Sequence, residues 1–251
     1  MTRPRLIVVI SFCAAIILPH IAKSELPQES RYLIIHSDDA GLSHSANRGT
    51  IDAMEQGIVS SASIMVPCPW FKEIAEYAQA HPERDFGVHL TLTCEWDHYR
   101  WGTVASADKV PSLLDKEGYM WGGTAEVARN AKAEEVELEL RAQIERAKLF
   151  GVPITHLDTH MGSVVCRPDL AAIYVKLGIE YDTPILFLRD LDPKLAAEYP
   201  ALAAASRMMV KKLEEHRLPL LDSIAQTYGT EQGKTRRQSY LDTLRDLPAG
   251  V

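Results

Sequence analysis

The segment YLIIHSDDAG, residues 32–41, is an apolar run that ends in two acidic residues, an alanine and a glycine. Its β-rich first part, residues 32–37, predicts a short strand, and residues 43–56 predict a helix that Gly57 ends. The same alternation predicts further strands over residues 59–66, 86–92, 154–160 and 184–188, and further helices over residues 70–80, 134–150 and 168–177, the last ended by Gly178. Strands that alternate with helices at this spacing indicate βαβ units and a parallel sheet.

This order favours an α/β fold, built as an irregular (distorted) β/α barrel with parallel strands, over an open sheet. Such barrels carry their catalytic groups at the carboxyl ends of the strands, where the polar residues discussed below also fall. Residues 93–123 interrupt the alternation with an aromatic-rich insertion that shows no clear period. We expect this insertion to be a functional excursion of a single domain, or a small subdomain, rather than a linker. Its tryptophans either contact a ligand or anchor the loop by packing.

The composition narrows the class of protein. The chain has 251 residues, a formal net charge of −7 and 24% charged residues. These values are typical of an ordinary globular protein and exclude disordered, collagen-like and coiled-coil chains. The length fits one large domain. The acidic balance argues against a nucleic-acid-binding protein, because phosphate contacts require a basic surface.

The first 24 residues are expected to be a secretory signal peptide. Two arginines precede a mostly apolar run over residues 6–18, and the tripeptide AKS, residues 22–24, suits cleavage after Ser24. The run is shorter than the roughly 20 residues that a membrane-spanning helix needs. We therefore predict an exported protein, periplasmic or secreted, whose mature domain spans residues 25–251 without a stable membrane span. An uncleaved N-terminal anchor is the alternative.

Three predicted strand ends carry residue types that bind metals. Asp38 and Asp39 end the first strand, and His89 and His160 lie at the ends of two later ones. One carboxylate with two imidazoles is a common ligand set for a catalytic divalent metal, Mg²⁺ or Zn²⁺, which activates a bound water. Asp39 could hold the metal while Asp38 accepts a proton from that water. Each element alone is also common as a capping pair or a structural histidine, so the prediction rests on their combination.

The segment THLDTH, residues 155–160, places His156, Asp158 and His160 on one face of a strand. A histidine that binds a metal usually donates its second ring N–H to a carboxylate or carbonyl, and Asp158 is a suitable partner. Ser43 is better explained as a helix N-cap than as a nucleophile, since it does not lie in a G-x-S-x-G turn.

These motifs resemble those of the YdjC-like (ChbG/HpnK) carbohydrate deacetylases. The matching segments run in the family's order and are HSDDAGLS (36–43), GIVSSASIMV (57–66), GVHLTLT (87–93), PSL (111–113), a helix centred on Gln143 and THLDTH (155–160). The resemblance implies a distorted β/α barrel that removes acetyl groups from N-acetylated amino sugars or oligosaccharides with a divalent metal. By motif position it implies Asp39, His89 and His160 as metal ligands and Asp38 as the general base.

The sequence departs from the family pattern at two places that bear on activity. Gly162 stands where many members carry another histidine. Members also continue beyond the segment LPAGV, residues 247–251, into a strand with a late His-Pro whose histidine resembles the acid for the leaving amine. The chain is then expected to lack the last βα unit, to take the acid from elsewhere, or to be catalytically impaired. A carbohydrate-binding protein on the same barrel is the alternative function, and a homo-oligomer stays open.

Overall fold

The computed structural model describes residues 32–191, 193–198, 200–225 and 233–246. The predicted signal peptide, residues 1–24, and the predicted start of the mature domain lie outside the described residues. Within the described ranges, none of the helices combines the length and the apolar character needed to cross a lipid bilayer.

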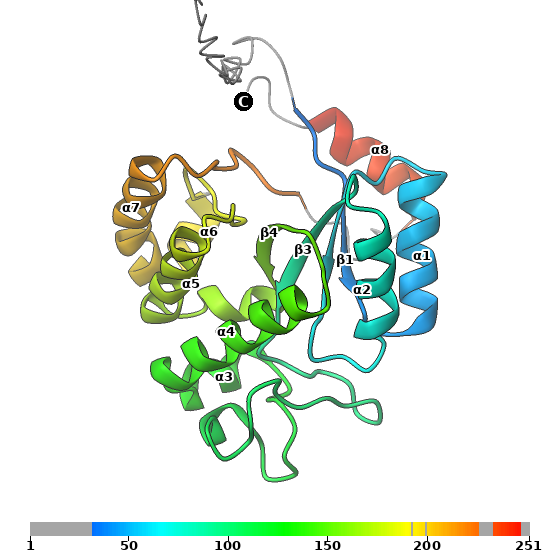
Figure 1. Ribbon diagram of the computed structural model, residues 1–251. Coiled ribbons are helices and arrows are strands. Elements are labelled where there is room, and N and C mark those ends of the chain that lie inside the picture. The colour runs from blue at the N-terminus through cyan, green and yellow to red at the C-terminus, as the bar shows by residue number, and fades with distance from the viewer. Residues whose placement is uncertain (1–31, 192, 199, 226–232, 247–251) are drawn as a thin grey trace, which may run out of the picture. The chain divides into compact units, whose positions relative to one another are not determined.

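Four parallel strands form the sheet, in the order β1-β2-β3-β4 (Figure 1). They are β1 (His36–Ala40), β2 (Ser61–Ile64), β3 (Asp85–Leu90) and β4 (Ile154–Thr159). Because each strand is separated from the next by at least one helix, the chain crosses over between parallel neighbours as the sequence predicts. The predicted α/β class with a parallel sheet is confirmed.

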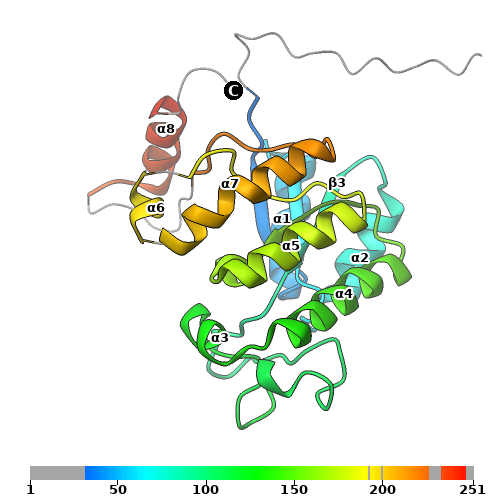
Figure 2. The ribbon, with the colours of Figure 1, turned by 90° about the vertical axis from the view of Figure 1, so that its left-hand side faces the viewer.

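Several of the helices pack against this sheet. The described helices are α1 (His44–Glu55), α2 (Phe71–Ala80), α3 (Thr124–Asn130), α4 (Ala133–Leu149), α5 (Pro168–Glu180), α6 (Pro193–Glu198), α7 (Pro200–Glu215) and α8 (Arg236–Asp246), with 3₁₀ segments η1 (Pro111–Leu113) and η2 (His160–Val165). Helix α1 contacts β1, α2 contacts β2 and α4 contacts β3, while α5 packs between α4 and α7 (Figure 2).

The sheet is curled, so that side chains from its two outer strands meet on one face, which we call the inner face. Neighbouring strands lie about 4.8 Å apart, so β1 and β4 would be separated by about 14 Å in a flat sheet. Nevertheless Nε2 of His36 on β1 lies 3.0 Å from Oδ2 of Asp158 on β4. A curled parallel sheet that does not close within the described residues is the geometry of a distorted β/α barrel.

Pairing continues beyond β4, although the regular strand predicted over residues 184–188 is wrong. This segment makes only isolated parallel bridges, Leu157 with Ile185 and Leu188 with Leu221. Pro184 contributes its carbonyl to the N–H of Leu157 at 2.8 Å but has no N–H of its own to extend the ladder.

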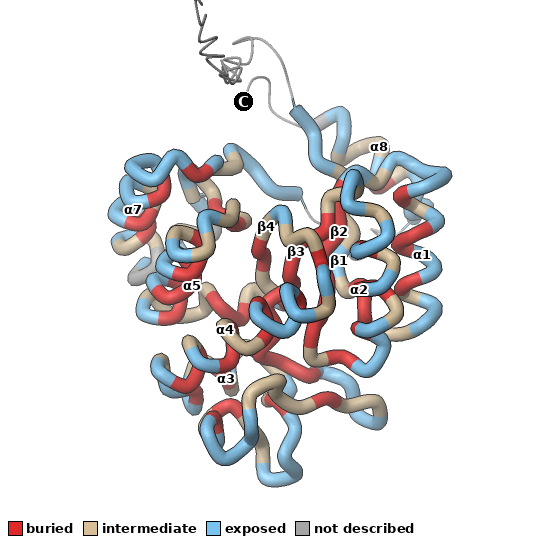
Figure 3. The backbone as a smooth tube through the Cα atoms, viewed as in Figure 1, coloured by how far each residue is buried: buried red, intermediate tan, exposed pale blue. Residues whose placement is uncertain are grey.

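The apolar periodicity of the sequence predicts the buried helix faces. On α4, the predicted stripe of Val136, Leu140, Ile144 and Ala147 is buried, and α4 begins and ends within one residue of the predicted bounds. Figure 3 shows buried positions along the strands and on the sides of the helices that face them. The predicted N-cap Ser43 accepts a hydrogen bond from the N–H of Ala46 at 3.1 Å.

Gly178 does not end a helix, contrary to the prediction. Helix α5 continues through it to Glu180. A Cβ atom at position 178 would lie 2.5 Å from Cγ2 of Ile185 and 3.2 Å from the carbonyl oxygen of Thr183. The glycine therefore allows α5 to approach the segment after it closely, which is a packing role rather than a helix stop.

The aromatic-rich insertion contains η1 and isolated bridges in place of longer elements. Trp101 is buried and donates from Nε1 to the carbonyl of Thr93 at 3.0 Å, and Trp121 donates to the carbonyl of Ser112 at 2.8 Å. Trp96, in contrast, is 48% exposed. Two of these tryptophans are packing anchors, and Trp96 is free to meet a ligand.

Helix α4 holds the insertion through two buried carboxylates. Glu139 accepts hydrogen bonds from the backbone N–H groups of Val104 and Ala105 at 2.9 and 2.8 Å. Glu135 accepts one from the backbone N–H of Ser112 at 2.7 Å. The insertion is thereby fixed beside the end of β3.

Candidate metal centre and active site

Asp38 and Asp39 both reach the inner face because β1 is irregular between them. The register of β1 with β2 shifts between Ser37 and Ala40, and Asp39 has a φ of 64°. In a regular strand, neighbouring side chains point to opposite faces. The left-handed backbone at Asp39, which aspartate tolerates better than most residues, removes this restriction.

The three predicted metal ligands face one another. Oδ1 of Asp39 lies 3.4 Å from Nε2 of His89 and 3.8 Å from Nε2 of His160. His89 is on β3 and His160 follows β4 directly, so the group combines three strand ends. Both imidazoles are buried, and their rings lie edge to face with centroids 5.5 Å apart. We call Asp39, His89 and His160 the Asp39 centre.

The outer nitrogens of both histidines have oxygen partners. Nδ1 of His89 lies 2.7 Å from Oδ1 of Asp158, and Nδ1 of His160 lies 2.9 Å from Oγ1 of Thr93. Ser63 Oγ also lies 3.0 Å from His89 Nδ1. These contacts favour the proton on Nδ1 and direct the Nε2 lone pair of each ring toward Asp39, as in metal-binding histidines.

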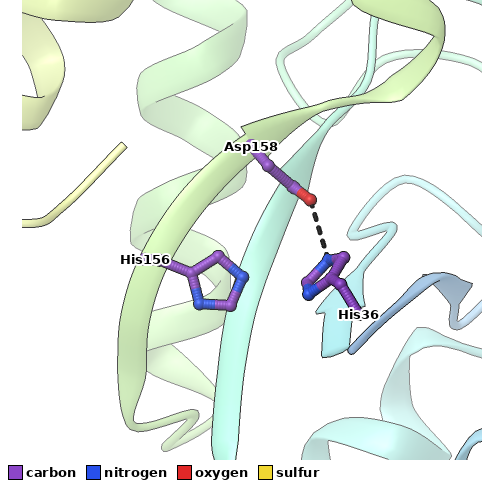
Figure 4. Close-up of side chains that lie close together, drawn as sticks. All are labelled: His36, His156 and Asp158. Carbon is purple, nitrogen blue, oxygen red and sulfur yellow. Dashed lines mark hydrogen bonds and ion pairs between the residues drawn. The ribbon is translucent and has the colours of Figure 1, made fainter. Parts of the chain in front are cut away.

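The structure adds His36, which the sequence reasoning did not single out as a site residue. Its Nε2 lies 3.3 Å from Oδ1 of Asp38. The same nitrogen lies 3.0 Å from Oδ2 of Asp158 (Figure 4). His36 therefore connects the predicted general base to the carboxylate behind His89. The sequence could have identified His36 by its position two residues before Asp38, because alternate residues of a strand share one face.

Charges at the inner face are strongly coupled. Burial alone would lower the pKa of His89, but the adjacent Asp158 carboxylate raises it to about 10. Burial acts to raise the pKa of Asp158, yet the charge of His89 and the hydrogen bond from His36 hold it well below its usual range. Burial raises the pKa of Asp38. The carboxylates around His89 thus favour a positive charge at this ring, either as a proton on Nε2 or as a cation bound in its place.

The donor set fits a divalent metal. Oδ1 of Asp39 is a buried acceptor without a hydrogen-bond partner among the described residues, and it faces two imidazole nitrogens. A buried, unpaired carboxylate oxygen is costly unless a cation or a donor satisfies it. Beside this centre, Asp38, His89 and Asp158 form a grouping whose ligand atoms lie within 4.8 Å of one another.

A cavity of about 260 Å³ opens in the insertion beside His160. Glu95 belongs to its wall, and Oε1 of Glu95 lies 3.6 Å from Nε2 of His160. The cavity is lined by Cys94, Glu95, Trp96, Asp97, Arg100, Asp115, Trp121, Gly122 and Glu126. Carboxylates, a guanidinium and indole rings around one hollow suit a hydroxyl-rich ligand, because they combine hydrogen bonding with apolar contact.

Comparison with known proteins agrees with this arrangement. The family described as YdjC-like protein matches residues 32–251, which include all three residues of the Asp39 centre. The chain belongs to the YdjC-like family. This YdjC-like protein is 31% identical over 217 residues to a carbohydrate deacetylase of Geobacillus stearothermophilus, a match that covers 86% of this chain and 75% of the relative.

Other relatives match a shorter part of this chain. A carbohydrate deacetylase of Brevibacillus brevis is 38% identical over 155 residues, 62% of this chain and 58% of the relative. One of Thermus thermophilus is 42% identical over 152 residues, 60% of this chain and 51% of the relative. The YdjC-like chain thus spans little more than half the length of these two relatives.

A solved structure shows the same fold. A crystal structure from Enterococcus faecalis V583, described as a candidate cellobiose-phosphate cleavage protein, superposes with a TM-score of 0.66 at 25% identity. The match covers 87% of this chain and 77% of that one. It supports the assignment of the curled parallel sheet to the distorted barrel of the family.

Proposed function

We propose that this protein is an exported, divalent-metal-dependent hydrolase that removes acetyl groups from N-acetylated amino sugars or oligosaccharides. The observation that carries the proposal is the Asp39 centre, in which one carboxylate oxygen faces two imidazole nitrogens. The carbohydrate deacetylases among the relatives support the substrate class. The arginines and the apolar run at the start of the sequence support export.

The residues have separate roles in this proposal. Asp39, His89 and His160 would hold the ion, Mg²⁺ or Zn²⁺. When bound, a divalent cation acidifies water and polarises an amide carbonyl. Asp38, with a side chain 37% exposed and an ion-pair contact to His36, accepts the proton of the attacking water. Once protonated, Asp38 can return this proton to the leaving amine.

The substrate would enter from the cavity beside His160. The exposed ring of Trp96 offers an apolar face on which a sugar can stack, while Glu95 and Arg100 offer hydrogen bonds to hydroxyl groups. This places the sugar on the insertion side and its acetamide toward the Asp39 centre.

The direct test is acetate release from a panel of N-acetylated sugars by the chelator-treated protein, with Mg²⁺ or Zn²⁺ added back. We expect metal-dependent release that is lost in Asp39→Asn, which keeps the left-handed backbone accessible. Asp52→Asn is the matched control, because Asp52 is an exposed aspartate on α1 paired with Arg48. Saccharide binding without acetate release would contradict the hydrolase and support the carbohydrate-binding alternative.

Export has its own test. We expect the mature chain, recovered from the periplasm or the medium of an expressing bacterium, to begin at Glu25. A cell-associated chain that retains its first residues would contradict cleavage after Ser24 and support the uncleaved anchor.

A further inference from the structure

A second group of ligand-type side chains lies on the inner face beside the Asp39 centre. His36 is the first residue of β1, and His156 and Asp158 lie on β4. One ligand atom of each lies within 4.8 Å of the other two (Figure 4). We propose that His36, His156 and Asp158, the His36 cluster, form a second divalent-cation site, suited to Zn²⁺ and separate from the Asp39 centre.

Both imidazoles of the cluster are held by their outer nitrogens. Nδ1 of His36 lies 2.9 Å from Oγ of Ser61, and Nδ1 of His156 lies 3.1 Å from Oδ1 of Asp85. When these oxygens accept the Nδ1 proton, each Nε2 has a lone pair for a cation, which would replace the hydrogen bond between His36 Nε2 and Asp158 Oδ2. This pairing of an outer nitrogen with an oxygen is the usual arrangement around metal-binding histidines.

The spacing of the inner atoms suits a small metal ion. Zinc binds nitrogen and oxygen at about 2.0–2.1 Å, so two ligands of one tetrahedron lie about 3.3 Å apart. Nε2 of His36 and Oδ2 of Asp158 are 3.0 Å apart, close to this edge. Oδ1 of Asp158 is engaged with His89, which leaves Oδ2 for the cluster. Two more oxygen atoms lie near His36 Nε2 and add acceptors to the site. They are Ser63 Oγ at 3.1 Å and Asp38 Oδ1 at 3.3 Å.

A ring nitrogen of His156, unpartnered among the described residues, is an independent indication of a cation site. Nε2 of His156 is buried and has no hydrogen-bond partner among the residues that the structure describes, although the side chain as a whole is 17% exposed. In Figure 4 the ring points from β4 toward His36. A buried ring nitrogen without a donor or acceptor beside it lacks what a bound cation would provide.

Gly87 makes room for this ring. A Cβ atom at position 87 would lie 2.4 Å from Nε2 and Cδ2 of His156. A glycine in the interior of a strand weakens it and commonly marks a place where another group must approach closely. Here the glycine on β3 allows the imidazole from β4 to lie across the sheet, with Nε2 directed at the cluster.

Two imidazoles and one carboxylate select the type of ion. Imidazole suits Zn²⁺, whereas Mg²⁺ and Ca²⁺ prefer oxygen ligands. Three protein ligands leave a fourth position of a zinc tetrahedron for water. The side chains of His36 and His156 are 21% and 17% exposed, which provides a route for the ion. The number of zinc ions per chain can be measured whether or not the protein has deacetylase activity.

The test counts zinc in the protein. We expect chelator-stripped protein, dialysed against Zn²⁺ and measured by atomic emission, to retain two equivalents. His156→Gln and His160→Gln should each retain one, and the double variant none. His81→Gln is the matched control with two equivalents, because His81 pairs with Glu83 at 3.3 Å as His156 pairs with Asp85 but lies outside both groups.

A milder variant covers the case in which His156→Gln does not fold. Asp85→Asn keeps every direct ligand and removes the negative charge at His156 Nδ1, where Thr155 Oγ1 at 2.9 Å remains as a neutral contact. The Kd of the second zinc should therefore rise about 10- to 100-fold while that of the first is unchanged. Glu83→Gln, which alters the equivalent pair with His81, should change neither. One equivalent in the wild-type protein that His156→Gln retains, two equivalents in His156→Gln, or no effect of Asp85→Asn would each overturn the proposal. One equivalent that is lost in His156→Gln and kept in His160→Gln would support the His36 cluster and contradict the Asp39 centre instead.

Discussion

Nδ1 of His89 lies 2.7 Å from Oδ1 of Asp158, so a buried carboxylate on β4 orients an imidazole on β3 toward Asp39. The other oxygen of the same carboxylate contacts Nε2 of His36 on β1. Asp158 is therefore the point at which three strands of the inner face are connected. Substitutions there should affect metal binding without removing any residue of the Asp39 centre.

We predict that Asp158→Asn raises the metal concentration needed for half-maximal acetate release by about 10- to 100-fold, since it replaces the charged acceptor that orients His89 with a weaker, neutral one. A metal titration of acetate release measures this effect. Asp169→Asn, which alters an exposed ion pair with Arg167, is the control and should leave the titration unchanged. An unaltered metal dependence in a folded Asp158→Asn protein would show that His89 is oriented by other contacts.

Asp38→Asn should lower kcat by about 10²- to 10⁴-fold, because the proton acceptor is lost. In the wild-type protein, activity requires the carboxylate and should fall as the pH drops through the pKa of Asp38, which burial places above its usual value. The pH profile of kcat measures both effects. A wild-type acid limb that persists in Asp38→Asn would assign the general base to another group.

Trp96→Ala should raise KM for an N-acetylated oligosaccharide about 2- to 10-fold, the effect of losing an aromatic contact worth about 0.5–1.5 kcal/mol. Because Trp96 is 48% exposed, its removal should leave Tm unchanged. Trp70→Ala is a matched control, since Trp70 is 42% exposed but does not line the cavity. Equal KM values for the two variants would remove Trp96 from the substrate site.

Glu139→Gln should flatten the pH dependence of stability. Burial raises the pKa of Glu139 to about 7 from an ordinary value of 4.5. In the folded protein the group keeps its proton after the unfolded chain has released it, so the free energy of unfolding falls as pH rises from about 4.5 to 7. The loss attributable to this group is about 3 kcal/mol.

Urea unfolding at pH 4.5 and pH 8 measures this difference, with Glu134→Gln as the control on the exposed face of α4. Equal pH dependence in the wild-type protein and Glu139→Gln would show that Glu139 titrates normally.

Two glycines in helices should respond to alanine with opposite signs. Gly178→Ala should destabilise the protein by about 1–3 kcal/mol, because the added Cβ meets Ile185 at 2.5 Å. Gly49→Ala, on an exposed part of α1 where the added Cβ meets no atom within 4 Å beyond its own helix backbone, should stabilise it by about 0.4–1 kcal/mol. Thermal unfolding of both variants tests the pair. A stabilised Gly178→Ala would show that α5 can shift away.

The sequence predicts most of the fold because apolar periodicity and capping residues act locally. The α4 stripe and the Ser43 cap are confirmed for this reason. The role of Gly178 depends on Ile185, and the short pairing around Pro184 depends on Leu157, so neither is visible in a local pattern.

In the candidate site, too, local motifs are predictable from the sequence and contacts between distant residues are not. Strand-end motifs identify Asp39, His89 and His160, which the structure brings together. The contact between His36 and Asp158 joins residues 122 positions apart on strands that are not neighbours, so only the curl of the sheet reveals it. The left-handed backbone at Asp39 likewise follows from the register of β1 with β2.

The way α4 holds the insertion has a consequence for evolution. Glu139 and Glu135 bind backbone N–H groups of the insertion, which every residue except proline supplies. The loop can therefore exchange its exposed side chains, Trp96 among them, without losing its anchorage. A lineage could acquire a new sugar preference by mutating this one stretch while the chemistry on the strands is inherited intact.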